Sequence, residues 1–513
     1  MDVPVRSLDP TKYWWWVLGA IVLLALGLRL VGLHDPIMDH PQWRQGDTAA
    51  IARNFAQLDF NIFYPQTDYD GPPPNYVELE LQIVPYLAAI GYKIFGVHEV
   101  FGRLISIGFS LGTIVVIAYF GRWLFESAFV GLVAALLFAI FPGSIYYGRT
   151  FMPDTAMTFF FTLALYASAR TLLAPAGKTI PWKEIGCAAL LALAFLAKPV
   201  SALAIIPLAC IGRLRSLVVI VPAAISLWLY LREVNSHAEW HWASGITREH
   251  VIPSLLQALV SPHAFVAKSV VLLTTIPSML STTMLGPVGF ALAVLGFLTP
   301  LRSRSNVLLY SWLVAAVLYA FVVVTVERVD YYLYPVLPLA ALAGGAFIRT
   351  FAALWSEASE RLQNVALAGA AVALIVVIGD NAAQIQPYYY YKRTVYLEAR
   401  RLHTLLAPGA LVVMAHYDPS ILYYMQHKGW EEDPLLWTPF DQQSAIRKGA
   451  RYFIAVEQNR FAKNAELYAW MQRFPLLPGS GIWPVYETDS AKILPGAEDR
   501  WQEFRRREKA GKH

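Results

Sequence analysis

The chain is poor in charged residues and in cysteine. Of its 513 residues, 15% are Asp, Glu, Lys or Arg and 57% are hydrophobic, whereas a soluble domain carries roughly 25% charged residues. This deficit excludes an ordinary soluble globular protein. The two cysteines, Cys187 and Cys210, both lie inside hydrophobic runs, which excludes a disulfide framework and a cysteine-based metal site. The net charge of +5 is spread along the flanks of such runs, so we expect no nucleic-acid partner.

Long hydrophobic runs fill much of the rest of the chain. A helix needs about 20 apolar residues to cross a bilayer, and the sequence offers about eleven such segments. We therefore predict an α-helical polytopic membrane protein whose membrane domain covers residues 1–380. The predicted spans are roughly 14–33, 99–121, 128–146, 153–172, 184–198, 200–212, 216–232, 275–299, 307–325, 331–349 and 364–380.

Lys and Arg gather in alternate loops between these runs. Short loops rich in these residues face the cytoplasm, which predicts a cytoplasmic N-terminus. The opposite, outer face then receives residues 34–98, with eight acids against three bases, and also residues 233–274 and everything after 380. The loops predicted to be cytoplasmic carry Arg122, Lys178, Lys183, Arg213, Arg215, Arg302, Arg304, Arg349 and Arg361.

The first outer loop, residues 34–98, is too polar to cross a membrane and too regular to be a plain connection. Residues 48–58 predict an amphipathic helix with Ile51, Phe55 and Leu58 on one face. A proline-rich break at residues 71–74 precedes a second predicted helix, 79–95, which we expect at the membrane interface. We expect a further interfacial helix at residues 248–270.

The composition turns soluble from residue 381. A predicted helix at 393–406 is followed by strand signals at 411–414, 452–456 and 484–486, with a short helix at 418–426 between the first two. Strands alternating with helices predict a small α/β domain, residues 381–513, on the outer face. We expect the basic tail after residue 497 to be disordered.

A cluster of acids and bases follows the first span directly. It contains Asp39, His40, Arg44, Asp47 and Arg53. Transfer of a sugar to a hydroxyl group needs a carboxylate that takes the acceptor proton, and cations or a metal ion that stabilise a departing phosphate. Both kinds of group occur here within a short stretch. The alternative for any one of these residues is a solvated or ion-paired side chain without a chemical role.

Further candidates lie at other ends of spans on the predicted outer side. Asp154 begins a span, and an ionisable residue at membrane depth is by default a candidate functional residue; the alternative is a structural pair with Arg149. Lys198 is a candidate ligand for a phosphate or an anchor whose amine reaches the interface. Glu78 and Glu80 precede the second interfacial helix, where they either orient an acceptor or cap that helix.

The segment before the tenth span combines charge with aromatic rings. Arg328 is a candidate phosphate ligand, and Tyr331 could stack on a sugar or an isoprenoid. The alternative is an aromatic belt beside a solvated turn. We find neither a P-loop nor a dinucleotide-binding glycine fingerprint. The sugar donor is therefore expected to arrive through the membrane.

Taken in order, these segments resemble the integral-membrane glycosyltransferases of the GT-C class, in the clan of protein O-mannosyltransferases and lipid A aminoarabinose transferases. The resemblance extends over roughly residues 14–380. Its carriers are Trp43-Arg44-Gln45-Gly46-Asp47-Thr48, Ile51-Ala52-Arg53-Asn54-Phe55, Tyr92-Lys93-Ile94-Phe95-Gly96 with Arg103, Gly148-Arg149 to Asp154, Ala197-Lys198-Pro199, and Tyr331-Tyr332-Leu333-Tyr334-Pro335.

The resemblance implies an inverting transfer from a polyprenyl-phosphate sugar to a hydroxyl acceptor on a protein, lipid or glycan. Asp39 or Asp47 would be the base, with Asp39 favoured. Asp154 would position the acceptor or the base, or would join Asp39 in holding a divalent cation. The candidates for binding the lipid phosphate and the rest of the substrate are His40, Arg44, Arg149, Lys198, Arg328, Tyr331, Glu78 and Glu80.

The resemblance also implies a location in the plasma (inner) membrane, with the site and the C-terminal domain in the periplasm or outside. Two other functions are compatible with the same features: a transporter or flippase for a lipid-linked saccharide, and a non-catalytic scaffold. A transporter is expected to carry charges along a path through the membrane. Here the charged clusters gather on one predicted face, which favours the enzyme.

Overall fold

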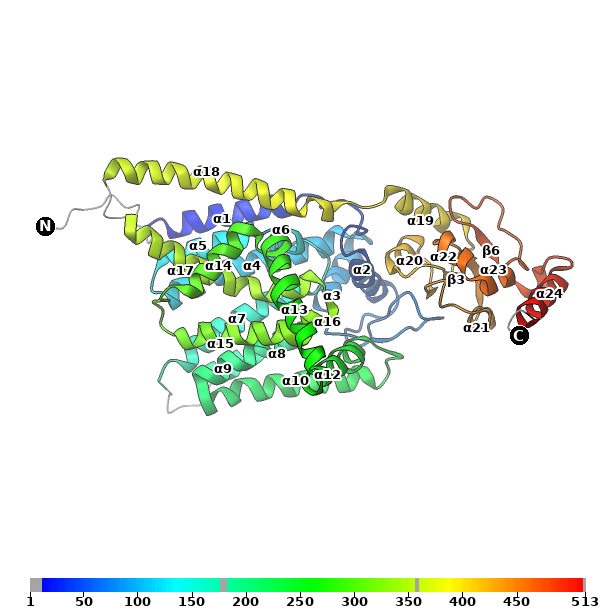
Figure 1. Cartoon of the computed structure of the whole chain (residues 1–513), viewed down its shortest axis with the longest axis horizontal. Coiled ribbons are helices and arrows are strands. Elements are labelled where there is room, and N and C mark those ends of the chain that lie inside the picture. Colours follow the sequence, from blue (N-terminus) through cyan, green and yellow to red (C-terminus); the bar gives the residue numbers. More distant parts are fainter. Residues whose placement is uncertain (1–11, 176–181, 356–358, 511–513) are drawn as a thin grey trace.

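The computed structural model describes residues 12–175, 182–355 and 359–510; Lys178 lies outside these ranges. Long helices fill one end of the molecule, and a small domain with a sheet forms the other end (Figure 1). The predicted combination of a polytopic helical domain with a small α/β domain is confirmed. The helices that build most of the long bundle are α1 (Trp14–Arg29), α4 (Val100–Leu124), α5 (Ala128–Ile140), α7 (Asp154–Leu172), α8 (Trp182–Ala197), α10 (Leu217–Asn235), α15 (Asn306–Tyr319), α17 (Leu337–Trp355) and α18 (Glu360–Ile385).

In the described part of the chain, six helical segments are long and apolar enough to cross a membrane, by length and composition. Four shorter apolar helices, of 10–17 residues, accompany them. The predicted boundary after residue 380 falls inside α18, which ends at Ile385. The count of about eleven spans stays a prediction. The six segments are Val100–Leu124, Pro199–Asn235, Pro262–Met284, Asn306–Glu327, Asp330–Ala353 and Arg361–Leu405.

The single span expected over residues 275–299 is wrong. Instead, α13 (Pro262–Met279) continues through a π-helical turn, Leu280–Met284, and α14 (Gly286–Leu298) begins as a separate helix. Gly286 has a φ of +71°, and a Cβ atom there would collide with the side chain of Asn381, so the break needs glycine. The interfacial helix expected at 248–270 is likewise divided, because Ser261 ends α12 (Ile252–Val260) and caps α13 by accepting a hydrogen bond from Ala264 N.

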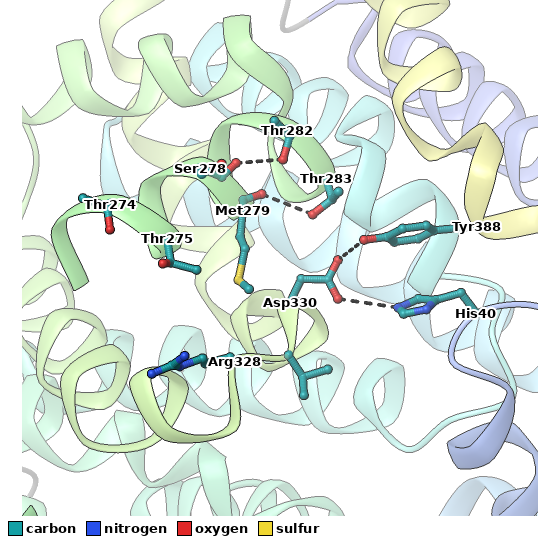
Figure 2. Close-up of a pocket in the computed structure, with 11 residues that line it drawn as sticks. His40, Thr274, Thr275, Ser278, Met279, Thr282, Thr283, Arg328, Asp330 and Tyr388 are labelled. Atoms are coloured by element: carbon teal, nitrogen blue, oxygen red, sulfur yellow. Dashed lines mark hydrogen bonds and ion pairs between the residues drawn. The ribbon is translucent and has the colours of Figure 1, made fainter. Parts of the chain in front are cut away.

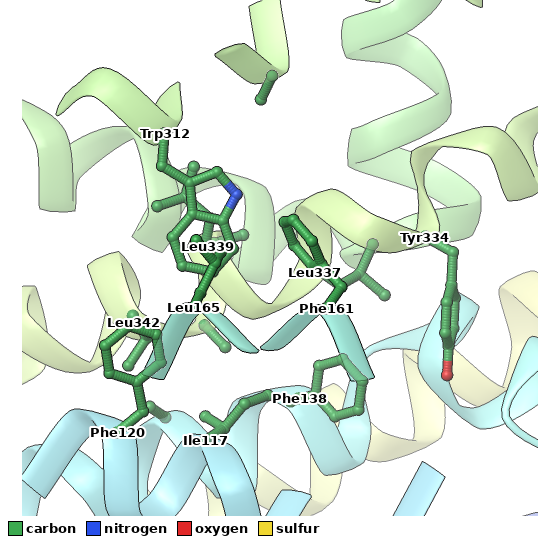
Figure 3. Packing of buried hydrophobic residues seen from close by; sticks show 14 of the residues in the cluster. Ile117, Phe120, Phe138, Phe161, Leu165, Trp312, Tyr334, Leu337, Leu339 and Leu342 are labelled. Atoms are coloured by element: carbon green, nitrogen blue, oxygen red, sulfur yellow. The ribbon is translucent and has the colours of Figure 1, made fainter. Parts of the chain in front are cut away.

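The core of the bundle is held by close packing of aromatic and small residues. The ring of Trp312 on α15 stacks on Phe120 of α4 at 6.3 Å and meets Phe161 of α7 edge-on at 5.6 Å (Figure 3). A Cβ atom on Gly131 would collide with the backbone of α4 at Ala118 O. In a membrane, where lipid tails are as apolar as the side chains, such small-residue contacts and shape fit drive helix association.

Residues of the first outer loop lie between the bundle and the C-terminal domain (Figure 1). The helix expected over 48–58 is longer, α2 (Gln42–Gln57), and it is buried continuously from Arg44 to Phe55 instead of lying at a surface. Its small residues permit this burial; a Cβ atom on Gly46 would come within 2.7 Å of Ser420 N in the C-terminal domain. The loop also holds β1 (Val77–Glu78), paired with β2 (Trp240–His241), and α3 (Ile83–Phe95).

The C-terminal domain contains a four-stranded sheet in the order β4-β3-β5-β6, of which β6 is antiparallel. The strands predicted near 411, 452 and 484 correspond to β3, β5 and β6, whereas β4 went unpredicted. The tail expected to be disordered instead forms α24, and Trp501 in it is buried. The elements are α19 (Arg393–Leu405), β3 (Leu411–Met414), α20 (Pro419–Met425), β4 (Gly429–Glu431), α21 (Pro439–Arg447), β5 (Ala450–Ile454), α22 (Gln458–Lys463), α23 (Ala465–Met471), β6 (Val485–Glu487) and α24 (Ala497–Ala510).

Candidate functional site

A cavity of about 600 Å³ lies where α2, the bundle and the C-terminal domain meet. We call it the amphiphilic cavity, because one side is apolar and one end is charged. The apolar wall comes from membrane helices and from α12: Leu203, Ile206, Val251, Ile252, Leu255, Leu318, Val322 and Val323. The charged and polar end is formed by Arg44, Asp47, Tyr69, Glu80, Lys198, Tyr417 and Glu431.

Asp47 stands out at the charged end. It is 6% exposed, and its Oδ1 has no hydrogen-bond partner among the residues that the structure describes. Burial raises the pKa of the Asp47 carboxyl to about 7, and the nearby Arg44 guanidinium opposes that rise. Because α2 places residues three apart on one face, Arg44 and Asp47 line the cavity together. A carboxyl with a pKa near neutrality and a free lone pair is suited to exchange a proton.

Two cations line the same end, each held by a carboxylate. Arg44 pairs with Glu80, and Lys198 Nζ lies 2.7 Å from Asp154 Oδ1. Lys198 also lies over the ring of Tyr331, with Nζ 5.1 Å from its centre. This arrangement leaves two positive groups facing one cavity, where an anionic group could bind between them.

Asp154 begins α7, as predicted, and it is 1% exposed. It does not line the cavity but holds Lys198, which does. The considered alternative, a pair between Arg149 and Asp154, does not form; Arg149 instead pairs with Asp39. Lys198 therefore lies between Asp154 and the amphiphilic cavity.

Asp39 lies outside the amphiphilic cavity. Its carboxylate is fully buried and accepts from Arg103 Nη2 at 3.1 Å, from Gln45 Nε2 at 2.8 Å, and from Arg149. Arg103 also donates to the carbonyl oxygens of the turn after α1, Gly32 at 2.6 Å among them. Both oxygens of Asp39 are thus occupied in joining this turn to α4 and to the segment before α7.

Two further predicted site residues, His40 and Arg328, line a second cavity of about 640 Å³ (Figure 2). There, His40 Nε2 lies 3.8 Å from Asp330 Oδ1, and Asp330 also accepts from the hydroxyl groups of Tyr147 and Tyr388, both at 2.6 Å. Arg328 is exposed and has a left-handed φ of +51°. The segment 328–332 separates the two cavities, because Tyr331 lines the first one and Asp330 the second.

The two glutamates predicted before α3 differ in role. Glu80 lines the amphiphilic cavity and holds Arg44. Glu78 is fully buried and accepts from Ser244 N and Ser244 Oγ, both at 3.0 Å, which joins the first outer loop to the segment after β2. Neither caps α3, whose N-cap is Gln82.

Sequence reasoning did not identify the residues that the C-terminal domain contributes to the site. Tyr417 and Glu431 line the charged end, although they lie far from Asp47 in sequence, and no local pattern marks them. The domain reaches the cavity because two backbone hydrogen bonds, Gly71 N to Gly429 O at 2.8 Å and Gly429 N to Asp68 O at 2.9 Å, join it to the first outer loop. Burial raises the pKa of Glu431 well above its ordinary value.

The expected metal ligands are not arranged as a metal site. Asp39 accepts hydrogen bonds from arginines, and Asp154 pairs with a lysine. Within residues 12–175, 182–355 and 359–510, no three His, Cys, Asp or Glu side chains come together as a ligand set. These residues do not fit a bound cation, and we assign no step to one.

Comparison with known proteins finds a family profile that matches part of the chain and a fold that matches nearly all of it. Residues 82–220 match the profile of the dolichyl-phosphate-mannose-protein mannosyltransferase family. A search of curated proteins finds no match. The structure resembles ArnT from Cupriavidus metallidurans bound to undecaprenyl phosphate, with a TM-score of 0.55, 14% identity, and 94% of this chain and 99% of that chain covered. It also resembles the archaeal oligosaccharyltransferase AglB from Archaeoglobus fulgidus in complex with an inhibitory peptide and a dolichol-phosphate (TM-score 0.55, 13% identity, 94% and 75% covered).

These findings confirm the resemblance predicted from the sequence. The GT-C fold extends over nearly the whole chain, and the family profile covers α3 to the start of α10. The family profile matches this part of the chain alone, and the solved structures, at 13–14% identity, show the fold. The matched segment includes Asp154 and Lys198 and ends before Tyr331, while Asp39 and Asp47 precede it.

Proposed function

We propose that this chain transfers a sugar from a polyprenyl-phosphate donor to a hydroxyl acceptor, with inversion at the anomeric carbon. The observation that carries the proposal is the amphiphilic cavity, which combines a long apolar wall with two cations and with two buried carboxyl groups, Asp47 and Glu431, each of which keeps one oxygen without a partner among the described residues. An isoprenoid chain fits the apolar wall, and its phosphate fits between Arg44 and Lys198. The likeness to structures solved with undecaprenyl phosphate and dolichol-phosphate supports the same class of ligand.

The proposed reaction assigns one proton transfer to Asp47. The acceptor hydroxyl attacks the anomeric carbon from the face opposite the phosphate, and Asp47 takes the hydroxyl proton. The bond from the anomeric carbon to the phosphate oxygen breaks, and the electron pair leaves with the phosphate. Arg44 and Lys198 stabilise the negative charge that develops there, because charge-assisted hydrogen bonds in a dry site are stronger than those in water.

Other predicted residues act through these groups. Asp154 positions Lys198 by its 2.7 Å contact, and Glu80 positions Arg44. Asp39 fixes the start of α2, and with it the direction in which Asp47 points. Tyr331 lies beside Lys198 and borders the space for the sugar.

The site is proposed to face the periplasm or exterior of a plasma membrane. In support, α2, α3 and the C-terminal domain lie together at one end of the bundle (Figure 1), and the loops rich in Lys and Arg were predicted for the other side. Within the described ranges, the candidate charged residues gather at that end instead of along a path through the bundle. This distribution favours a transferase over a transporter.

The test is release of radiolabelled sugar by the purified chain from a panel of polyprenyl-phosphate sugars, with a membrane extract as the source of acceptor. We compare wild type with Asp47→Asn, Asp39→Asn and Asp154→Asn. Glu239→Gln serves as a matched control, because Glu239 is an exposed acid on the same predicted face. Turnover that disappears in Asp47→Asn and persists in Glu239→Gln supports the proposal. Tight lipid binding without turnover by any donor would reject it.

A further inference from the structure

A third cavity, of about 500 Å³, lies where α19 meets the ends of the membrane helices. His34 in its wall follows α1, Glu99 immediately precedes α4, and Arg393 follows α18. Both α4 and the segment that contains α18 are apolar enough to cross a membrane. The cavity therefore lies where membrane helices end and the soluble domain begins, which is the level of lipid headgroups. It shares no lining residue with the amphiphilic cavity.

Two arginines on one face of α19 line this cavity. Arg393 and Arg400 are two turns apart, both are exposed, and within the described ranges neither has a carboxylate oxygen within 4.0 Å. Two other arginines nearby, in contrast, are ion-paired. Arg53, also in the wall, pairs with Asp68 and donates to Tyr423 O at 2.7 Å, and Arg401 on another face of α19 pairs with Glu398. The two arginines that face the cavity thus form no ion pair with a described residue.

The position of Arg393 is unfavourable for the helix itself. Arg393 is the first residue of α19, which has no acidic residue in its first turn and no side-chain cap on its N-terminus. The N-terminus of a helix carries partial positive charge and is stabilised by anions, not by cations. Helix stability therefore gives no reason for an arginine here, whereas an anion bound beside it would satisfy both the arginine and the free N–H groups.

The opposite charge comes from other elements. Asp35, after α1, and Glu99, before α4, line the same cavity, and neither forms an ion pair with a described residue within 4.0 Å. The cavity thus has a cationic side on α19 and an anionic side at the ends of the membrane helices. A ligand that carries a phosphate next to an ammonium group matches both sides.

We propose that this cavity binds the headgroup of an aminophospholipid, with the phosphate on Arg393 and Arg400 and the primary ammonium group near Asp35 and Glu99. The bound lipid would join α19 to the ends of α1 and α4, and would thus fix the C-terminal domain on the membrane surface. The proposal does not depend on the transferase reaction, because lipid binding is measured without any sugar donor.

The experiment is native mass spectrometry of the full chain in detergent, with phosphatidylethanolamine, phosphatidylglycerol or phosphatidylcholine added at equal concentration. We expect wild type to retain phosphatidylethanolamine best. The double variant Arg393→Ala/Arg400→Ala should bind it roughly 30-fold more weakly, since a basic residue at a lipid surface contributes about 1 kcal/mol. The matched control is Arg447→Ala/Lys448→Ala, which removes two exposed positive charges from the end of α21.

Two further measurements sharpen the result. Glu99→Gln should reduce the preference for phosphatidylethanolamine over phosphatidylglycerol and leave the binding of phosphatidylglycerol unchanged. Free phosphoethanolamine should fail to displace the lipid. Displacement would show that the cavity takes a soluble ligand, and would overturn the proposal that it binds a membrane lipid. Equal lipid retention by wild type and the double arginine variant, or equal loss in the control, would overturn the site itself. Because both arginines are exposed and unpaired, the variants should unfold at the wild-type Tm.

Discussion

Asp39 and Asp47 belong to the same short segment, yet the structure gives them opposite surroundings. Asp39 is fully buried and accepts hydrogen bonds from two arginines and a glutamine. Asp47 lines a cavity, keeps one oxygen without a partner in the described structure, and has a pKa raised to about 7 by burial. A carboxylate whose two oxygens both accept hydrogen bonds from buried donors fixes geometry, whereas one with an oxygen that has no donor can accept a proton. This difference is our reason for proposing Asp47, and not Asp39, as the base.

The largest expected effect on turnover comes from Asp47→Asn. The amide has the shape of the carboxyl but accepts no proton, so we expect kcat to fall by about 10²–10⁴-fold, the usual contribution of a general base. The Tm should not fall, because a neutral group replaces a buried ionisable one. Sugar release and thermal unfolding, measured on the same preparation, check both expectations. Retention of more than a tenth of wild-type kcat would remove Asp47 from the role of base.

Asp39→Ala should act on stability instead of chemistry. It leaves the buried guanidinium groups of Arg103 and Arg149 without their shared carboxylate, and breaking a buried ion pair on one side costs about 3–5 kcal/mol. We expect a clearly lower Tm, and a kcat of the folded fraction that falls much less than in Asp47→Asn, because Asp39 acts only through the position of α2. The measurement is thermal unfolding combined with turnover at low temperature. A variant with wild-type Tm and no turnover would reverse the assignment of the two aspartates.

Sequence patterns predicted most of the architecture because the governing signals are local. Long hydrophobic runs mark membrane helices, and short apolar runs within a more polar segment mark β3 and β5. The exceptions depend on tertiary contacts. Residues 275–299 read as one apolar run, but Gly286 breaks it against Asn381. Likewise, residues 48–58 predict an amphipathic helix, yet α2 is buried continuously from Arg44 to Phe55, and Gly46 in it packs against Ser420 of the C-terminal domain.

The site was predictable in its residue types but not in its pairing. The candidate cations and carboxylates were named from the sequence, and Arg44, Asp47, Glu80, Lys198 and Tyr331 line one cavity. Which carboxylate pairs with which cation depends on distances that no spacing encodes. Tyr417 and Glu431 belong to the C-terminal domain, which backbone hydrogen bonds join to the first outer loop. Backbone hydrogen bonds do not depend on residue type, so the amino-acid sequence does not reveal this contact.

Lys198→Ala tests the proposed phosphate end of the cavity. Loss of a charge-assisted hydrogen bond of about 1.5–3 kcal/mol should lower kcat/KM by roughly 10–100-fold. Arg328→Ala is the control, because Arg328 lines the second cavity, and we expect a change below about 3-fold, within the effect of a typical surface substitution. Since Lys198→Ala also leaves Asp154 unpaired, Lys198→Arg should restore part of the activity. Equal losses in Lys198→Ala and Arg328→Ala would mean that the phosphate binds across both cavities.

The dependence on pH most directly tests the difference between the two aspartates. Asp47 must be ionised to act as a base, so with its pKa at about 7, kcat/KM should rise with pH and level off above neutrality, falling about tenfold per unit below pH 7.

Stability should change with pH in the opposite sense. An unfolded aspartate ionises near pH 4, so between about pH 4 and pH 7 the folded chain holds a proton that the unfolded chain has lost, and stability declines as the pH rises through this window. Asp47→Asn should therefore gain Tm relative to wild type at pH 8 more than at pH 5, whereas Asp39→Asn, whose partners are arginines, should show no such gain. A pH–rate profile that is flat between pH 5 and pH 8 would leave Asp47 without the proton transfer assigned to it.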